Sequence, residues 1–194
     1  MTKVFIDSAM SVDGFWADRD GKSVFPLDDL YSSGILKTLV DRTGAVVMSR
    51  RSFEMASDPD WFAGNYELQV PIHVITGQPP AKHPKEDCGV TFSFHANFAD
   101  ALAGARNAAG GRDVAIIGER SAVEAAIAAD AVDEIYLRIV PKICGSGEPL
   151  MRDLGDVHRV FDISNVKTTG HAVHIHLVRN RDAENDGLHR RISS

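Results

Sequence analysis

Short apolar runs alternate with amphipathic stretches along most of the chain, and this alternation predicts strands and helices in turn. The runs are bounded by polar and turn-forming residues, as is typical of strands in a buried sheet. The predicted strands cover residues 4–10, 45–49, 72–76, 91–94, 114–117, 134–140, 160–166 and 173–178.

Three stretches between these runs predict helices, at residues 30–41, 98–109 and 122–129. Asn97 is followed by Asp100 at the spacing of an N-terminal cap. Ser121 is followed by Glu124 at the spacing of a capping box, so the last of these helices is expected to begin at about residue 122.

The order of these elements predicts the fold class α/β, with a mostly parallel central sheet, helices on both of its faces and a C-terminal antiparallel hairpin. The hairpin follows from the last two strands, which are separated by residues 167–171 with Gly170 in the loop. No Pro-, Gly- or Ser-rich linker divides the chain, so we expect one domain over residues 1–181. Residues 182–194 turn polar and are expected to form a flexible tail.

Composition and charge narrow the classes of function. The chain has 194 residues, of which 44% are hydrophobic, and this is enough for one sizeable core. Its formal net charge of −6 disfavours nucleic acid and anionic membranes as partners and favours small molecules. Neither a signal peptide nor a bilayer-spanning run is recognised, so a cytoplasmic location is expected. Cys88 and Cys144 lack metal-ligand spacing and are expected to be ordinary thiols.

The junction at residues 113–124 is the most informative stretch for ligand binding. An apolar run ends at Gly118, and the predicted helix begins a few residues later. The amide N–H groups and the positive dipole end of such a helix start attract anions, of which phosphate is the usual one. Many strand-to-helix connections bind nothing, so plain architecture explains the same pattern.

Other familiar chemistries are not indicated. The chain has no G-x-S-x-G elbow, no P-loop and no zinc-type Cys/His cluster. The alternating His171, His174 and His176 are interpreted as a polar hairpin face rather than as metal ligands, and no metal is predicted. Trp16 either covers a cofactor or shields apolar surface, and Trp61 forms either an apolar patch or a dimer contact.

Five segments carry a family resemblance through their order. They are Ser-Val-Asp-Gly-Phe at 11–15, Val-Met-Ser-Arg-Arg-Ser-Phe-Glu at 47–54, Pro-Ile-His-Val-Ile-Thr at 71–76, Ile-Ile-Gly at 116–118, and the stretch 132–150 with its Gly-Ser-Gly-Glu-Pro-Leu ending. Together they resemble the dihydrofolate reductase-like superfamily, in the branch of the C-terminal reductase domain of bacterial riboflavin-biosynthesis enzymes. The resemblance covers about residues 3–180. It implies a three-layer α/β/α domain that binds NADPH, often as a homodimer, and transfers a hydride to a pterin or a ribosylaminopyrimidine.

The resemblance also implies where the cofactor binds. In relatives, the segment that matches residues 49–52 holds the NADPH phosphates, and Arg50, Arg51 and Ser52 suit that role because a guanidinium offers a fixed fork of donors. Solvated surface arginines and an ordinary turn after Thr76 are the alternative interpretations. The implied cofactor residues are Ser49, Arg50, Arg51, Ser52, Thr76, Gly77, Gly118, Glu119, Arg120 and Ser121.

Two positions depart from the family pattern. Ser49 stands where relatives have the glycine of Met-Gly-Arg, and Glu119 stands where they have the second glycine of a Gly-Gly pair. A carboxylate at the second position adds bulk and repels a pyrophosphate. Either Glu119 turns into solvent at the helix start, or Arg120 neutralises it, or the cofactor site has been lost or remodelled.

On the substrate side, residues 11–20 match the mobile loop that covers the nicotinamide in dihydrofolate reductase. Asp13 either bonds loop backbone or binds substrate, and Gly14 serves the turn. Ser146 lies in a Gly-rich loop that matches the surroundings of the family's substrate pocket. No catalytic residue is assigned, because the cofactor supplies the hydride and needs no protein nucleophile.

The favoured function is that of an NADPH-dependent reductase of a small heterocycle, most similar to the 5-amino-6-(5-phosphoribosylamino)uracil reductase of riboflavin biosynthesis. A pterin reductase is an alternative, because Asp28 and Asp29 lie where dihydrofolate reductase carries its pterin-binding acid, although a helix dipole explains acids there equally well. A non-catalytic nucleotide-binding protein and a purely structural dimeric module are further alternatives. The expected partners are a heterocyclic substrate and a second copy of the chain.

Overall fold

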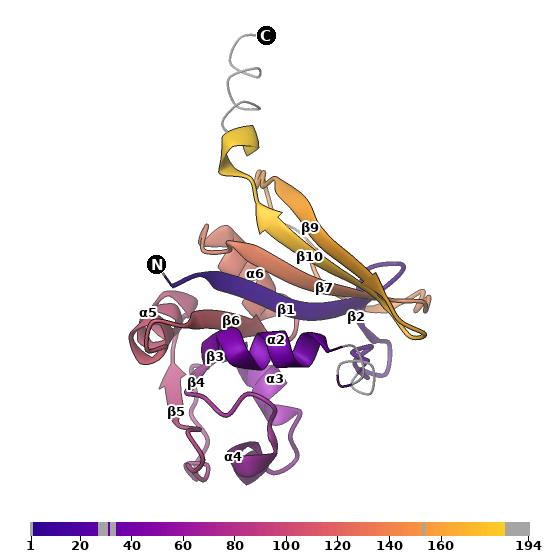
Figure 1. Cartoon of the computed structure of the whole chain (residues 1–194). Helices are drawn as coiled ribbons and strands as arrows, with labels where there is room; N and C mark the ends of the chain where they lie inside the picture. The colour runs from indigo at the N-terminus through magenta and orange to yellow at the C-terminus, as the bar shows by residue number, and fades with distance from the viewer. Residues whose placement is uncertain (1, 27–30, 32–33, 153, 185–194) are drawn as a thin grey trace.

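The computed structural model describes residues 2–26, 31, 34–152 and 154–184. Its main sheet contains β1 (Val4–Ser11), β3 (Thr43–Ser49), β4 (Ile72–Ile75), β5 (Phe92–His95), β6 (Asp113–Ile117), β7 (Glu134–Val140), β9 (Phe161–Thr168) and β10 (Val173–Arg179). The strand order is β5-β4-β3-β6-β1-β7-β10-β9 (Figure 1). All neighbours from β5 to β7 run parallel, whereas β10 is antiparallel to both β7 and β9. The predicted mostly parallel sheet with a C-terminal hairpin is therefore confirmed.

Helices cover both faces of this sheet and complete three layers. The helices α5 (Phe98–Ala108) and α6 (Arg120–Ala128) pack on one face, and α2 (Ile35–Arg42) and α3 (Arg50–Glu54) pack on the other. Strand residues divide between the two cores by alternation: Ile6 of β1 belongs to the α5/α6 core, and Phe5 belongs to the α2/α3 core. A short 3-10 helix (Pro59–Trp61) and α4 (Phe62–Asn65) follow α3.

The C-terminal end of α2 is fixed to the sheet by Arg42. Its guanidinium lies 2.6 Å from the Asp113 carboxylate of β6 and 2.7 Å from the Glu134 carboxylate of β7. It also lies over the Phe5 ring, 4.6 Å from the ring centre. This partly buried network places α2 across the middle of the sheet.

The predicted helix at residues 30–41 is interrupted at Gly34, whose φ of +74° is not helical. Tyr31 is helical and α2 begins at Ile35, whereas the predicted start at residue 30 lies outside the described residues. Helix α6 begins two residues earlier than predicted, because its N-cap is Glu119 instead of Ser121. The Asn97 cap is confirmed, since its side chain accepts a hydrogen bond of 2.9 Å from the Asp100 amide.

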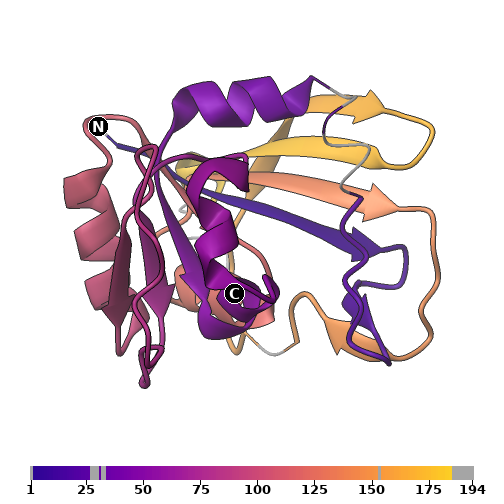
Figure 2. The ribbon, with the colours of Figure 1, turned by 90° about the horizontal axis from the view of Figure 1, so that it is seen from below.

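A second, two-stranded sheet occupies segments that the sequence analysis treated as loops. It joins β2 (Phe15–Asp18) to β8 (Gly147–Pro149) in antiparallel fashion (Figure 2). Gly147 has φ +144°, and a Cβ there would lie 2.2 Å from the Ala17 carbonyl oxygen. The loop prediction was therefore wrong at both segments, and a glycine makes their close pairing possible.

The start of the predicted tail packs against the domain. Glu184 is buried and accepts hydrogen bonds from the Arg179 guanidinium and the Val160 amide, at 2.9 and 3.0 Å. Ordered packing thus continues to residue 184, and residues 185–194 lie outside the described part.

Candidate functional site

The candidate cofactor residues gather where three adjacent parallel strands end. Ser49 ends β3, Thr76 follows β4 and Gly118 follows β6. Because parallel strands end at the same edge of a sheet, their following turns lie next to one another. This edge is the candidate functional site.

Ser52 and Gly118 pack closely against each other at this edge. Gly118 has φ +110°, and a Cβ on it would lie 2.2 Å from the Ser52 Oγ atom. Only glycine permits both this backbone conformation and this approach. The first turn of α3 and the β6 turn therefore form one continuous surface.

Ser49 organises the start of α3. Its Oγ atom accepts a hydrogen bond of 3.1 Å from the Ser52 amide, which makes Ser49 the N-cap. The two hydroxyl oxygens are 3.4 Å apart. The replacement of the family's glycine by Ser49 thus supplies a helix cap and places a hydroxyl beside Ser52.

Arg50 and Thr76 line the same side of the edge. The Arg50 Nε atom is 2.6 Å from the Glu54 carboxylate, and its side chain is 47% exposed, so this ion pair is open to solvent. Thr76 uses its hydroxyl inside its own turn, donating to the Gln78 carbonyl at 2.9 Å and accepting from the Gln78 amide at 3.1 Å. Gly77 is exposed in the turn between Thr76 and Gln78. The Arg50 guanidinium can therefore exchange its Glu54 partner for another anion, whereas the Thr76 hydroxyl already has structural partners.

Arg51 points away from the strand ends and contacts the small sheet. Its guanidinium forms an ion pair with Glu148 of β8 and lies over the Trp16 ring of β2, 5.3 Å from the ring centre. Trp16 is buried in the core. The structure thus separates Arg51 from Arg50, and it resolves the two sequence alternatives for Trp16 in favour of shielding apolar surface.

Glu119 does not turn into solvent, and its carboxylate is hydrogen-bonded to Ser121.

 It is 2% exposed and is the N-cap of α6. Its carboxylate accepts a hydrogen bond of 2.9 Å from the Ser121 amide and a second one from the Ser121 hydroxyl. The expectation that Glu119 swings outward is therefore wrong. Arg120 instead lies with its Nε atom 3.9 Å from the Glu124 carboxylate.

The position of Glu119 changes the anion chemistry at this helix start. A backbone amide and a hydroxyl that would otherwise face a phosphate are bound by the protein's own carboxylate. The same carboxylate places negative charge at the positive end of the α6 dipole. The Ser121 amide and hydroxyl are consequently engaged by Glu119.

The candidate substrate residues form a separate group beside the small sheet. The Asp13 carboxylate accepts hydrogen bonds from the Ser11 hydroxyl at 2.6 Å, the Cys144 amide at 3.0 Å and the Gly145 amide at 2.7 Å. The Ser11 hydroxyl, and then these amides, lower the pKa of Asp13 to about 2. Gly14, with φ +86°, forms the turn with Ser11. Asp13 therefore connects two loops through a carboxylate that is ionised at neutral pH.

Ser146 lies on the exposed part of the loop that Asp13 holds. Glu148, two residues after Ser146, forms the ion pair with Arg51. This ion pair connects the loop that carries Ser146 to α3. Asp28 and Asp29 are outside the described residues.

Sequence reasoning missed a buried ion pair on the α2 face of the sheet. Asp7 of β1 and Arg138 of β7 are 5% and 1% exposed, and the Arg138 Nη1 atom donates to the Asp7 carboxylate. Burial raises the pKa of Asp7, and the charge of Arg138 opposes that effect. A charged residue inside each of two apolar strand runs was the available signal.

The three histidines of the hairpin do not share one environment. His171 is exposed in the turn, His174 is buried, and His176 lies 2.8 Å from Glu134 and stacks on Tyr136. Within the described residues, no group of three His, Cys, Asp or Glu side chains is arranged to hold a metal ion. The described part of the chain also contains no helix long and apolar enough to cross a membrane.

Comparisons with known proteins show the family and the fold of this chain. A sequence model of the family described as RibD C-terminal domain matches residues 46–175. The chain is 26% identical over 187 residues to YwjB, an uncharacterized protein of Bacillus subtilis, and the match covers 91% of this chain and 98% of that protein.

Solved structures show the same fold. A putative riboflavin biosynthesis protein from Shewanella sp. PV-4 is 21% identical with a TM-score of 0.71, over 92% of this chain and 99% of that one. A diaminohydroxyphosphoribosylaminopyrimidine deaminase/5-amino-6-(5-phosphoribosylamino)uracil reductase from Thermotoga maritima is 14% identical with a TM-score of 0.65. The match covers 92% of this chain but 57% of the Thermotoga protein, so this chain spans little more than half of that length.

Proposed function

The chain belongs to the RibD C-terminal domain family, and on this basis we propose that it is an NADPH-dependent reductase of a small heterocycle. The proposed reaction is most similar to that of 5-amino-6-(5-phosphoribosylamino)uracil reductase, an activity named for the Thermotoga neighbour. The observation that carries the proposal is the contact of Ser52 with Gly118 at the strand ends. A glycine that brings a helix start against a strand-end turn creates the kind of backbone surface that a dinucleotide phosphate approaches.

In this proposal the α3 side of the edge holds the cofactor phosphates. Arg50 exchanges its solvent-exposed pair with Glu54 for a phosphate, and its guanidinium presents two parallel donors to the phosphate oxygens. The hydroxyls of Ser49 and Ser52 lie beside it as further hydrogen-bonding groups. When bound, the nicotinamide supplies the hydride, and the protein contributes orientation and exclusion of water.

The helix start of α6 does not fit the family's usual role in this proposal. Because the Glu119 carboxylate is bound to the Ser121 amide and hydroxyl, a pyrophosphate at that point would meet a buried negative charge. We therefore place the phosphate contacts on α3 and the Gly118 turn, and we treat Glu119 as a structural cap.

On the substrate side, Asp13 positions the loop rather than contacting the heterocycle. Two of its hydrogen bonds come from the amides of residues 144 and 145 and hold the loop that carries Ser146. The Arg51–Glu148 pair couples this loop to α3. Ser146 is thus the proposed polar contact with the substrate.

A second candidate function is that of a nucleotide-binding protein without catalytic activity. The buried Glu119 favours this alternative, because it removes donors on which reductases of the family depend. Both functions predict NADPH binding, and turnover separates them.

The experiment that tests the reductase is NADPH oxidation, followed by absorbance at 340 nm, with the ribosylaminopyrimidine and with dihydrofolate as separate substrates. Turnover of the ribosylaminopyrimidine that is lost in Arg50→Ala supports the proposal. NADPH binding without turnover of either substrate favours the second candidate. The absence of NADPH binding in the native protein, together with binding in Glu119→Gly, would show that Glu119 closes the site and would refute both.

A further inference from the structure

The side chain of Arg51 lies between the candidate cofactor edge and the small sheet of β2 and β8. Arg51 belongs to α3, where it stands between Arg50 and Ser52 of the cofactor edge. Its guanidinium forms an ion pair with the Glu148 carboxylate of β8. Arg51 thus connects the helix that carries the proposed phosphate ligands to the strand that follows Ser146.

The same guanidinium covers the indole of Trp16 on β2. It lies 5.3 Å from the ring centre, and Trp16 is 3% exposed and belongs to the core on the α5/α6 face. In the turn after β2, a Cβ on Gly21 would lie 3.7 Å from the Arg51 Nη2 atom. A planar guanidinium can stack on an aromatic face and pair with a carboxylate at once. Arg51 therefore contacts both strands of the small sheet.

The two neighbouring arginines are equally exposed but have different partners. The side chains of Arg50 and Arg51 are 47% and 45% exposed. Glu54 lies on the same helix as Arg50, so exchange of this partner for a ligand breaks no contact between elements. Glu148 lies on β8, and loss of this partner would release the small sheet from α3. This difference favours Arg50 as the arginine that takes up a phosphate.

The substrate candidates depend on the strand that Arg51 contacts. Ser146 directly precedes β8, and the two residues before it donate their amides to Asp13. The Arg51–Glu148 pair therefore bears on the position of Ser146 relative to α3. In hydride transfer the reacting groups must be in near contact, and a misplacement of about 1 Å costs about a hundredfold in rate.

We propose that Arg51 is a positioning residue of the reductase, which holds the small sheet against α3 and so fixes the separation of substrate and cofactor. Its guanidinium does not bind the cofactor phosphates, a role that belongs to Arg50. This inference rests on the proposed function, because the separation matters only when both ligands bind.

Amide hydrogen exchange of the full chain tests the hold on the small sheet without any ligand. The Leu150 amide is hydrogen-bonded to the turn after β1 at 3.0 Å and the Val24 amide to β2 at 2.9 Å, so both report local opening. Arg51→Ala removes the ion pair and the cation–π contact together and is expected to speed their exchange about tenfold. The double variant Arg51→Ala/Glu148→Gln should exchange no faster than Arg51→Ala, because both changes remove the same pair.

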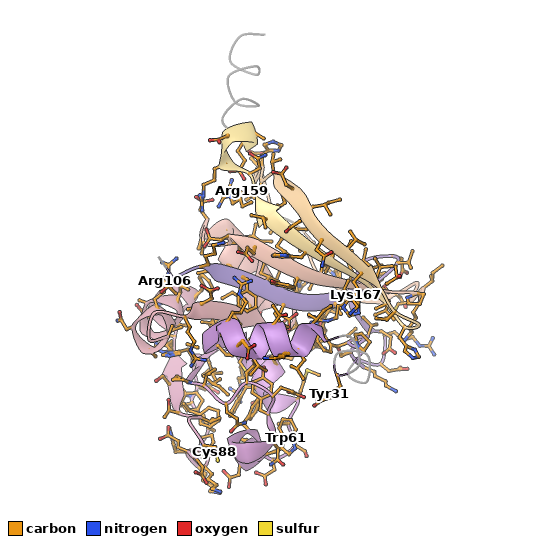
Figure 3. All side chains as sticks on the ribbon, in the orientation of Figure 1. Tyr31, Trp61, Cys88, Arg106, Arg159 and Lys167 are labelled. Atoms are coloured by element: carbon orange, nitrogen blue, oxygen red, sulfur yellow. The ribbon has the colours of Figure 1, made fainter. Side chains whose placement is uncertain are left out.

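Fluorescence of Trp16 gives a second readout in the ligand-free protein. The chain has two tryptophans, and Trp61 lies beside α4 rather than beside the small sheet (Figure 3). Trp61→Phe therefore leaves Trp16 as the single reporter. Because Arg51 covers its indole, Arg51→Ala in this background is expected to shift the emission to longer wavelength and to increase quenching by acrylamide.

Lys142→Ala is the matched control. The pair of Lys142 with Asp18 of β2 has side chains that are 45% and 21% exposed, against 45% and 19% for Arg51 and Glu148. The Lys142–Asp18 pair does not involve α3, and Asp18 keeps hydrogen bonds from the amides of residues 20 and 22. We expect Lys142→Ala to leave the exchange rates and turnover within about twofold of the native values and the Trp16 emission unchanged.

NADPH affinity and turnover separate positioning from cofactor binding. In an isothermal titration with NADPH, the Kd of Arg51→Ala is expected to stay within about twofold of the native value, whereas Arg50→Ala weakens binding strongly. With the ribosylaminopyrimidine as substrate, the kcat of Arg51→Ala is expected to fall at least about tenfold, with little change in the KM for NADPH.

The inference is overturned if Arg51→Ala weakens NADPH binding as much as Arg50→Ala, because Arg51 would then be a phosphate ligand. Exchange rates that are unchanged in Arg51→Ala, or raised equally by Lys142→Ala, would also overturn it, as would a native kcat in Arg51→Ala. A native protein that neither binds NADPH nor turns over the substrate overturns the reductase proposal itself, and the same titrations show this before any variant is compared.

Discussion

Replacement of Gly118 by alanine tests the packing at the candidate site. The native φ of +110° is outside the regions that alanine readily adopts, which costs about 1–3 kcal/mol. The added Cβ would lie 2.2 Å from the Ser52 Oγ atom, and relief of that overlap by movement of the side chain costs about 1–3 kcal/mol more. We therefore expect Gly118→Ala to lower the free energy of unfolding by about 2–6 kcal/mol.

Two reference variants separate backbone strain from steric overlap. Gly110 has φ +60° and open space around its missing Cβ, so Gly110→Ala reports left-handed strain without a clash. Ser52→Ala removes the clashing oxygen but leaves the Ser52 Cβ 3.0 Å from the new methyl group. Gly118→Ala should therefore cost less in the Ser52→Ala background, by at least about 1 kcal/mol.

The assay is urea unfolding at equilibrium, followed by circular dichroism, for the native protein, the three single variants and the double variant. NADPH affinity measured on the same samples shows whether the site loses its ligand together with its packing. The reasoning is refuted if Gly118→Ala costs no more than Gly110→Ala, or if the effects of Gly118→Ala and Ser52→Ala add to within about 0.5 kcal/mol.

Three further predictions concern the rest of the molecule. Asp7→Ala leaves Arg138 buried without a counter-charge and should destabilise the protein by about 3–5 kcal/mol in urea unfolding, whereas Asp7→Leu combined with Arg138→Met should recover much of that loss; equal destabilisation by both variants would contradict this. Burial, and then the nearby His95, lower the pKa of His73 from 6.5 to about 4, so the unfolded state binds more protons between these values. The free energy of unfolding should fall by up to about 3 kcal/mol as the pH decreases from about 6.5 to about 4, and His73→Gln should reduce that slope; an unchanged slope would refute the assignment. We propose that the chain forms a homodimer through the face of β9 that carries Ile163, which is 68% exposed; Ile163→Glu should convert the dimer to a monomer in sedimentation velocity, and a monomeric native protein would be evidence against it.

The strands and their parallel order were predictable because each is a short apolar run with a clear boundary. The run at residues 134–140, for example, coincides with β7, and the Asn97 cap fixes the start of α5 as expected. Such features depend on local sequence and on burial of both sheet faces, so they are visible without coordinates.

Features that depend on contacts between distant segments were not predictable. Glu119 caps α6 in place of Ser121 because its own backbone is extended at the end of β6, and both residues have side chains suited to that role. The pairing of β2 with β8 joins segments about 130 residues apart, and neither strand is long enough to show alternation. The Asp7–Arg138 pair likewise spans the sequence, so each residue alone looked like an isolated charge in an apolar run.

The candidate site shows the same difference between predictable and unpredictable features. Ser49, Ser52 and Gly118 lie together near the ends of β3, β4 and β6, as the family resemblance implied, because the parallel topology alone determines that edge. The separation of Arg51 from Arg50 depends on the small sheet, where Glu148 and Trp16 contact the Arg51 guanidinium. Adjacent arginines in sequence thus have different surroundings in the structure.

The central claim is that the α3 side of the strand-end edge holds NADPH, and its most direct test is a thermal-shift titration of the native protein and Arg50→Ala with NADPH. A ligand that binds only the folded state raises the melting temperature by an amount that grows with the logarithm of the free ligand concentration over Kd. The account predicts a concentration-dependent rise with NADPH for the native protein and a rise that is strongly reduced in Arg50→Ala, while Arg106→Ala on the exposed face of α5 behaves like the native protein. Equal stabilisation of the native protein and Arg50→Ala, or no stabilisation of the native protein, would contradict it.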